Sequence, residues 1–278
     1  MPYLSDAAQS ENPDIAYLYL GSPGVELDEN NPENRFSPAW LDAIEGLLDE
    51  IAAGPAKALV ITSTGKFFTN GLDTDFVFAN ASELPAYLDR VHALYAKVLT
   101  LPQSTVAAIN GHAFGAGAML ALCADYAVMR TERGFWSLPE AALNMPFPRG
   151  MAGLLTTRLP DRTATEAMLT SRRYGAADAV AAGIVDDAVS ADDLLTRAGE
   201  VAAERTAVAG PNLANVKRAL RQHLLADLVA PTPAALLIVT RPPRAVMALF
   251  TTSMPTLRPD SAESGGQSKS REGTRVCR

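Results

Sequence analysis

The chain of 278 residues is poor in cysteine and histidine, the residues that most often build disulfides and transition-metal sites. Its two cysteines, Cys123 and Cys277, are far apart and form no Cys-x-x-Cys pair. Its three histidines show no spacing typical of metal ligands. We therefore expect neither a disulfide framework nor a metal site.

The sequence also lacks an uninterrupted apolar run of about 18 residues, the length that a membrane-spanning helix needs. Its first residues, Met-Pro-Tyr-Leu-Ser-Asp, do not contain the basic segment followed by an apolar one that marks a secretory signal. Basic residues are in the minority, and the net charge of -7 argues against nucleic acid as the main partner. We expect a cytoplasmic protein with no membrane span.

Apolar segments alternate between strand-like and helix-like patterns in the first half of the chain. Strands are predicted over residues 15–20, 58–62 and 105–109, and helices over 39–53 and 84–99. Ser37 and Pro38 provide an N-cap and a first helical residue for the first of these helices. An alanine-rich helix is expected from Ala116 to about Met129, although residues 126–129 also fit a short strand. This alternation predicts an α/β fold with parallel strand pairing.

The second half of the chain reads as mainly helical. Helices are predicted over residues 151–159, 163–169, 176–182, 194–207 and 212–228, with a strand-like pair at Ile184 and Val185. Six prolines between Pro231 and Pro259 exclude a long regular helix there. Residues 261–278 have almost no apolar content and are expected to be disordered. We therefore expect a core over residues 1–195, a C-terminal helical region over 196–230 and a proline-rich tail over 231–278.

Two glycine-containing turns follow predicted strands, at Asn70-Gly71-Leu72 and at Gly115-Ala116-Gly117. Such turns can direct two backbone N–H groups at one oxygen atom, and the second turn opens a helix, where N–H groups have no partner. Glu140 lies downstream in Leu138-Pro139-Glu140 and could transfer protons beside that oxygen. A dinucleotide fingerprint is excluded because Leu120 occupies its third glycine position, and a nucleophile elbow is excluded because the turn has no serine.

The motifs together resemble the crotonase superfamily, the enoyl-CoA hydratase/isomerase family. The resemblance covers roughly residues 14 to 220. It is carried by motifs in the family's order and spacing: Asn34-Arg-Phe-Ser-Pro38, Lys66-Phe-Phe-Thr-Asn-Gly-Leu-Asp73, Ala107-Ala-Ile-Asn-Gly-His-Ala-Phe-Gly-Ala-Gly117, Cys123-Ala-Asp125, Leu138-Pro-Glu140 and residues 176–185.

The resemblance implies a crotonase-like spiral of β-β-α units with a C-terminal helical region that builds a homotrimer or hexamer. It implies an acyl-CoA thioester as substrate, and no cofactor besides the CoA that the substrate carries. Matching residue by residue, the backbone N–H groups of Leu72 and Ala116 are the oxyanion-hole donors, and Glu140 is the catalytic carboxylate. A thioester carbonyl gains negative charge when its α-carbon loses a proton, and two N–H donors would stabilise that charge.

Hydratases of the family use two glutamates, and the position of the second one is occupied here by Met119. Addition of water usually needs two proton-transferring groups, whereas moving a double bond from C3 to C2 needs one base. Together with the sequence from Asp125 to Phe147, this departure favours the Δ3,Δ2-enoyl-CoA isomerase branch and a role in fatty acid metabolism. Two alternatives are an enoyl-CoA hydratase or other lyase that uses Asp73 or Asp75, and a non-catalytic CoA-thioester-binding protein.

Other residues are assigned to substrate binding by the same resemblance. Arg35 and Lys66 are candidates for the CoA phosphates, and a solvated surface charge is the alternative for each. Met119 and Phe147 are candidates for an acyl pocket, with a place in the hydrophobic core as the alternative. Gly71, Asp73 and Gly115 complete the predicted set because they belong to the two turns.

Overall fold

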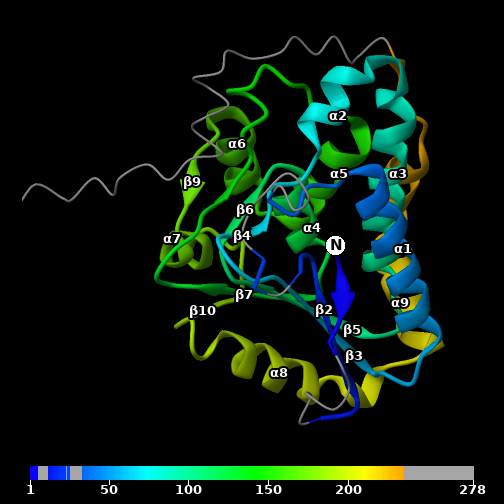
Figure 1. Ribbon diagram of the computed structural model, residues 1–278, viewed down its shortest axis with the longest axis vertical. Coiled ribbons are helices and arrows are strands. Elements are labelled where there is room, and N and C mark those ends of the chain that lie inside the picture. Colours follow the sequence, from blue (N-terminus) through cyan, green and yellow to red (C-terminus); the bar gives the residue numbers. More distant parts are fainter. Residues whose placement is uncertain (6–11, 23, 26–32, 235–278) are drawn as a thin grey trace, which may run out of the picture.

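Apolar strands from distant parts of the chain assemble into a six-stranded sheet with the order β1-β2-β3-β5-β7-β10 (Figure 1). The computed structural model describes residues 1–5, 12–22, 24–25 and 33–234. The edge strand β1 pairs antiparallel with β2, and every other pair in this sheet is parallel. The strands are β1 (Tyr3–Leu4), β2 (Ile15–Tyr19), β3 (Ala58–Thr62), β5 (Ser104–Ile109), β7 (Tyr126–Arg130) and β10 (Asp187–Val189).

A second, four-stranded sheet has the order β4-β6-β8-β9. It contains β4 (Phe67–Thr69), β6 (His112–Phe114), β8 (Trp136–Ser137) and β9 (Arg173–Tyr174), of which the first three are parallel. Three strands of the large sheet are each followed by a strand of the small sheet and then by helix. The pair β3–β4 is followed by α2 (Thr74–Ala79) and α3 (Leu84–Leu99), β5–β6 by α4 (Ala116–Leu122), and β7–β8 by α5 (Arg149–Arg158). The expected β-β-α units and parallel pairing are confirmed.

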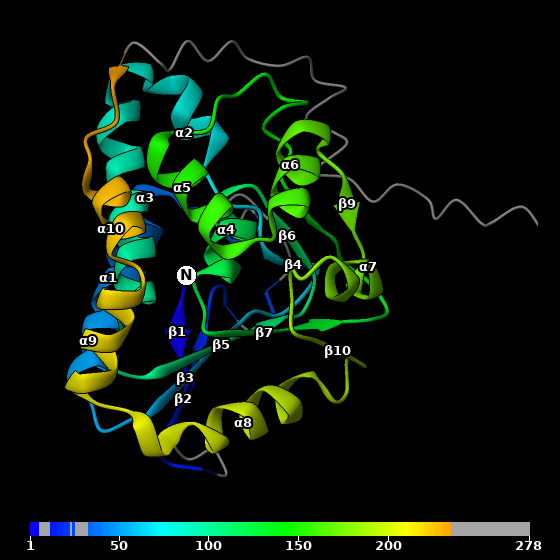
Figure 2. The ribbon, with the colours of Figure 1, turned by 180° about the vertical axis from the view of Figure 1, so that it is seen from behind.

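The large sheet is buried on both faces, which explains why its strands are continuous apolar runs. Along β3, Leu59 and Ile61 belong to the main core, whereas Ala58 and Val60 face a smaller cluster. Helix α8 (Leu194–Glu204) covers this second face, as Figure 2 shows below the sheet. The main core lies between the other face, the small sheet and the helices α1 (Pro38–Ala53), α3, α4 and α5.

The two helices predicted over residues 39–53 and 84–99 are confirmed. The Ser37 hydroxyl accepts a hydrogen bond from the Trp40 N–H at 3.2 Å, so Ser37 caps α1 as expected. Helix α3 spans the predicted residues 84–99. A short 3₁₀ turn, η2 (Ala81–Glu83), links it to α2.

The predicted helix from Ala116 to about Met129 is wrong in its second half. Helix α4 ends at Leu122, and residues 126–130 form β7. The chain leaves the helix because Asp125 bonds to Thr105 of the neighbouring strand through both its N–H and its carboxylate. A long-range contact therefore overrides the local helix propensity of the alanines.

Three further assignments in the C-terminal half differ from the prediction. Ile184 and Val185 are not a strand, because their N–H groups bond to the Ala179 carbonyl and close helix α7 (Ala176–Ala181). The single helix predicted over 212–228 is two helices, α9 (Pro211–Leu220) and α10 (Gln222–Val229), which meet at the buried Arg221. The predicted helix over 194–207 ends at Glu204 and is followed by η3 (Thr206–Val208). Helix α6 (Asp161–Thr170) contains the predicted residues 163–169.

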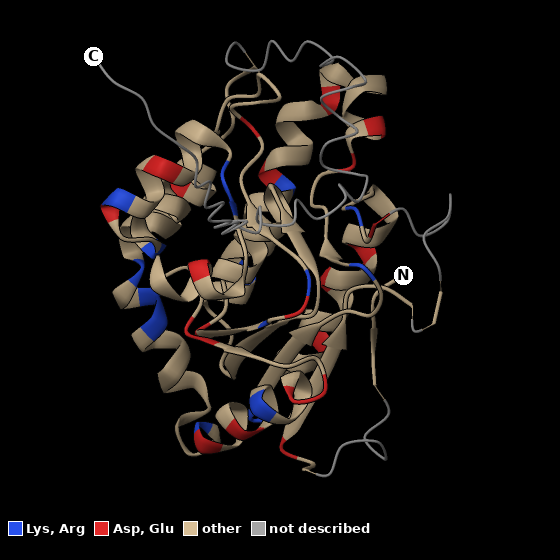
Figure 3. Cartoon of the chain, turned by 90° about the vertical axis from the view of Figure 1, so that its left-hand side faces the viewer, with Lys and Arg blue, Asp and Glu red and all other residues tan. Residues whose placement is uncertain are grey.

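The predicted division at residue 195 falls inside α8, which packs on the large sheet. Of the expected tail, residues 231–234 are described, and the Thr232 N–H donates to Asp89 on α3 at 2.8 Å; the tail from residue 235 lies outside the described residues. No described helix is long and apolar enough to cross a membrane. Basic and acidic residues are interspersed over the helices and loops seen in Figure 3.

Candidate active site

Three parallel strands of the small sheet end side by side, and the residues predicted to be catalytic follow them directly. β4 runs into Gly71 and Leu72, β6 runs into Gly115 and Ala116, and β8 runs toward Glu140. Because the strands are parallel, their carboxyl ends lie at one edge of the sheet. The topology thus brings together segments that are far apart in the sequence.

Gly71 is required where the first turn meets the second. Its φ angle is +79°, and a Cβ atom added there would lie 2.6 Å from the Gly117 nitrogen and 2.8 Å from the Ala116 nitrogen. No side chain fits at those distances, so only glycine allows the two turns to approach each other this closely. The Gly71 carbonyl accepts a hydrogen bond from the Phe36 N–H at 2.8 Å. In a trans peptide the following N–H, that of Leu72, then points the opposite way.

The second turn places Ala116 at the start of α4. Gly115 has φ of 52° and ψ of -123°, and its carbonyl accepts the first helical hydrogen bond, from the Met119 N–H at 3.1 Å. Within the described part of the chain, the N–H groups of Leu72 and Ala116 donate no hydrogen bond. Both donors are therefore available to an acceptor that enters between the turns.

Glu140 lies against the second turn. Its Oε1 atom is 3.1 Å from the position that a Cβ of Gly115 would occupy, so the glycine makes room for the carboxyl group. Its Oε2 atom is buried and has no hydrogen-bond partner among the described residues. Burial raises the pKa of Glu140 from its ordinary value to about 7. The N–H groups of Leu143 and Met145 bond to the Glu140 carbonyl and hold the loop that carries it.

A single cavity joins these groups and has a volume of about 60 Å³. Among the predicted site residues, Leu72, Gly115, Ala116 and Glu140 line it. Its other walls are mostly apolar and come from the β4–α2 segment, from α3 and from the loop after β8: Asn70, Thr74, Leu84, Leu88, Pro139, Leu143, Met145, Pro146 and Pro148. Leu84 and Leu88 were not predicted as wall residues, because they repeat at the helical spacing that also marks core residues.

Neither aspartate proposed as a second acid lies in the cavity wall. The Asp73 side chain caps α2 by accepting hydrogen bonds from the N–H groups of Asp75 and Phe76. Asp75 is exposed and pairs with Arg35 at 3.0 Å. Among the described residues that line the cavity, Glu140 is the only carboxylate.

The two predicted phosphate contacts make interactions within the protein and do not line the cavity. Arg35 pairs with Glu33 at 2.8 Å and with Asp75, and its side chain is only 13% exposed. Burial by itself would lower the pKa of Arg35, but the neighbouring carboxylates hold it above its ordinary value. The Lys66 ammonium lies over the Phe67 ring, 5.0 Å from its centre. Their assignment to CoA phosphates remains a prediction.

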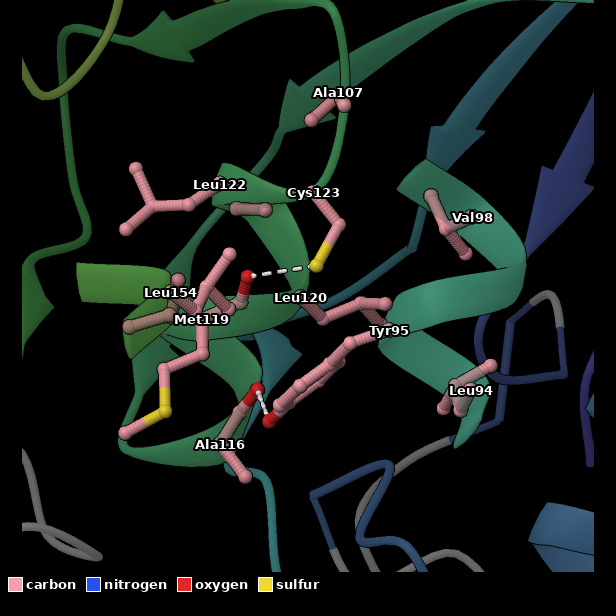
Figure 4. Close-up of a cluster of buried hydrophobic side chains, with 14 of the residues drawn as sticks. Leu94, Tyr95, Val98, Ala107, Ala116, Met119, Leu120, Leu122, Cys123 and Leu154 are labelled. Carbon is pink, nitrogen blue, oxygen red and sulfur yellow. Dashed lines mark hydrogen bonds between the residues drawn. The ribbon is translucent and has the colours of Figure 1, made fainter. Parts of the chain in front are cut away.

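Met119 and Phe147 also lie outside the cavity wall. Met119 is fully buried and belongs to the main hydrophobic core, where Figure 4 shows it near Ala116 and Leu154. Phe147 is half-buried and packs against the same core. Both side chains therefore lie in or against the hydrophobic core, which is the alternative to an acyl pocket that the sequence left open. No group of three or more potential metal ligands occurs in the described ranges.

Comparison with known proteins shows which family the chain is similar to. Residues 24–235 match the sequence profile described as enoyl-CoA hydratase/isomerase. The chain is 34% identical over 161 residues to the peroxisomal enoyl-CoA delta isomerase 1 of Arabidopsis thaliana. The aligned region covers 56% of this chain and 67% of the relative. It is 34% identical over 166 residues to enoyl-CoA delta isomerase 3 of the same plant, covering 56% and 68%. A crystal structure of an enoyl-CoA hydratase/isomerase family protein from Pseudomonas syringae has the same fold, with a TM-score of 0.73, 23% identity and coverage of 80% of this chain and 93% of that one.

Proposed function

Because the chain belongs to the enoyl-CoA hydratase/isomerase family, we propose that it is an isomerase that converts 3-enoyl-CoA to 2-enoyl-CoA with Glu140 as the sole proton shuttle. The thioester oxygen accepts hydrogen bonds from the N–H groups of Leu72 and Ala116. Glu140 removes a proton from C2, and the electron pair moves into the carbonyl to form a dienolate. Glu140 then returns the proton to C4, the dienolate collapses, and the double bond lies between C2 and C3.

One observation carries this proposal: among the described residues that line the cavity, Glu140 alone provides a carboxyl group, its Oε2 atom is buried, and the residues of both N–H donors line the same cavity. The dienolate oxygen carries the developing charge, and two preorganised donors stabilise it more than they stabilise the neutral thioester. A pKa near 7 makes Glu140 a stronger base than an exposed glutamate while a large share of it is ionised near neutral pH. The apolar walls suit a hydrocarbon acyl chain.

The absence of a second carboxylate from the described cavity wall favours isomerisation over hydration. A hydratase activates water with one group and protonates carbon with another. The relatives named delta isomerases support the same choice at the level of the family.

The test is to assay purified protein with a 3-enoyl-CoA and a 2-enoyl-CoA side by side. We expect isomerisation of the first and no appreciable hydration of the second. Glu140→Gln keeps the shape of the side chain but cannot accept a proton, so kcat should fall at least ~10²-fold. Glu83→Gln is the matched control, because Glu83 is exposed beside the cavity residue Leu84, and it should leave kcat unchanged.

Each other outcome identifies an alternative. Rapid hydration of 2-enoyl-CoA by the wild type would favour the lyase. Tight binding of both thioesters without turnover would favour a non-catalytic binding protein. Full activity of the Glu140→Gln variant would remove Glu140 from the mechanism.

A further inference from the structure

Helix α3 carries two buried tyrosines whose hydroxyl groups bond to the backbone beside the two oxyanion donors. Tyr87 is 6% exposed and Tyr95 is fully buried. A buried hydroxyl destabilises the fold unless it has a hydrogen-bond partner. In both tyrosines the partner is main chain from a turn of the candidate active site.

The Tyr87 hydroxyl makes two hydrogen bonds that hold the turn containing Leu72. Its hydroxyl accepts a hydrogen bond from the Asp73 N–H at 3.0 Å, immediately after Leu72. The same hydroxyl donates to the Phe36 carbonyl at 2.8 Å. The Phe36 N–H in turn bonds to the Gly71 carbonyl, which belongs to the same peptide plane as the Leu72 N–H. Tyr87 therefore holds the residue that orients the first donor.

Tyr95 holds the residue that carries the second donor. Its hydroxyl donates to the Ala116 carbonyl at 2.8 Å, the dashed contact drawn between α3 and α4 in Figure 4. The carbonyl on the other side of the donor, that of Gly115, is bonded to the Met119 N–H. Ala116 is thus fixed through the peptides on both of its sides.

The two tyrosines lie on the face of α3 that also forms part of the cavity wall. With a period of 3.6 residues, Leu84, Leu88, Tyr87 and Tyr95 project from the same side of the helix. Leu84 and Leu88 line the cavity, whereas neither tyrosine does. One rigid helix therefore contacts the acyl cavity and both donor segments.

We propose that Tyr87 and Tyr95 are positioning residues that together set the separation and direction of the two oxyanion donors. The inference rests on the proposed function, because it assigns the tyrosines to the same oxyanion hole. A donor stabilises the enolate only if it is already aimed at the place where the charge develops. Without the hydroxyl groups, each turn keeps its N–H but gains freedom to move away from that place.

The experiment removes one oxygen atom at a time with Tyr87→Phe and Tyr95→Phe. The first readout is steady-state isomerisation of 3-hexenoyl-CoA. The second is the carbonyl stretching frequency of bound 2-butenoyl-CoA, measured by difference infrared spectroscopy with a ¹³C-labelled carbonyl. We expect kcat to fall about 10-fold in each variant, less than the ~10²-fold or greater loss for a missing donor, with KM changed less than about 2-fold. In each variant, the carbonyl stretching frequency of the bound thioester should lie closer to the frequency in water than it does in the wild type.

Tyr174→Phe is the matched control. Tyr174 is also fully buried, and its hydroxyl donates to Glu166 at 2.8 Å, away from the cavity. This variant should keep the wild-type kcat and stretch, even if its melting temperature falls. A purely structural role for Tyr87 and Tyr95 predicts the same behaviour for all three variants.

The inference is overturned if both variants keep the wild-type stretch, whatever happens to kcat or to the melting temperature. The two substitutions are independent, so a variant that does not fold leaves the other to decide. If the wild type shifts the carbonyl stretching frequency of bound 2-butenoyl-CoA but does not isomerise 3-hexenoyl-CoA, the proposed reaction is wrong. The stretching frequency in the variants then still decides the role of the tyrosines. If the wild type does not shift the stretch at all, the oxyanion hole and the inference fail together.

Discussion

At the scale of single residues, the close approach of the two turns depends on the missing side chain of Gly71. A methyl group there would overlap the Ala116 and Gly117 nitrogens and would also strain a backbone with φ of +79°. We predict that Gly71→Ala lowers kcat/KM at least ~10²-fold, because both donors are displaced. Gly175→Ala is the control, since Gly175 has φ of -70° and no atom within 4 Å of an added Cβ. Equal activity of the two variants would contradict the assignment of these turns to the oxyanion hole.

The raised pKa of Glu140 predicts a pH dependence of activity. Only the carboxylate can accept the C2 proton, so kcat/KM should rise with pH and level off above a midpoint near 7. The measurement is a pH profile of isomerisation under kcat/KM conditions. A midpoint near 4.5, the ordinary value for glutamate, would show that the carboxyl group is not desolvated in solution.

The same shift predicts that Glu140 destabilises the fold as pH rises. Between its ordinary pKa and about 7, the folded protein keeps a proton that the unfolded chain releases, so the free energy of unfolding falls as pH increases. From about pH 5.5 to about pH 8.5, the stability of the wild type should fall by about 2 kcal/mol relative to Glu140→Gln. Urea denaturation of both proteins at the two pH values checks this, and a constant difference would contradict it.

At the scale of elements, a buried charge cluster connects the end of α4 to the C-terminal helix α9. Asp125 pairs with Lys217 and, at 3.0 Å, with Arg221, both of which are about 5% exposed. Burial alone would raise the pKa of Asp125, but these cations hold it below its ordinary value. Arg158 from α5 donates to the carbonyls of Leu122 and Ala124 at 2.8 Å each. The helix that presents Ala116 is therefore fixed at its far end by α5 and α9.

We predict that Asp125→Ala destabilises the protein by about 3 kcal/mol, because it leaves buried cations without a counter-charge. Lys217→Met should cost less, about 1–2 kcal/mol, because Arg221 remains a partner of Asp125 while the Gln103 carbonyl loses the Lys217 donor. Asp49→Ala is the control, because the Asp49 side chain is 71% exposed where it pairs with Lys97. This variant should change the stability little. Urea midpoints of the variants measure these differences, and equal losses for Asp125→Ala and Asp49→Ala would show that burial of the cluster adds nothing.

Element boundaries were predictable where a local signal sets them. Ser37 and Pro38 start α1, and the apolar runs define β3 and β5 almost to the residue. Two boundaries that failed are set by a distant group: Thr105 ends the α4 segment, and buried Arg221 separates α9 from α10. Residues that are 20 or more positions apart in the chain leave no periodic pattern that could reveal such contacts.

At the scale of the whole molecule, α9 exposes an apolar strip. Val216 is 54% exposed and Leu220, one turn later, is 73% exposed. Val216 and Leu220 are four residues apart and therefore share one face of the helix, and contiguous exposed apolar patches are typical of interaction surfaces. The family resemblance implies a trimer built by the C-terminal helices, and this strip is our candidate for part of its interface.

We predict that the wild type sediments as a trimer or hexamer and that the double variant Val216→Glu, Leu220→Glu shifts toward the monomer. Two charges at the centre of an apolar interface would be desolvated without partners. Leu169→Glu on α6, where the leucine is also 73% exposed, is the control and should leave the assembly unchanged. Analytical ultracentrifugation measures this, and unchanged sedimentation of the double variant would exclude α9 from the interface.

The sequence by itself determined the α/β class, the alternation of the large-sheet strands with helices, the two glycine turns and the presence of one candidate base at Glu140. These features depend on local patterns: apolar periodicity, turn residues and motif spacing. Only the tertiary structure decided which groups surround that base. It placed Leu84 and Leu88 in the cavity wall, kept Met119 in the core, and brought Tyr87 and Tyr95 to the donor turns. The reason is physical: burial and hydrogen-bond partners depend on which faces of distant elements meet, and a local pattern does not record that.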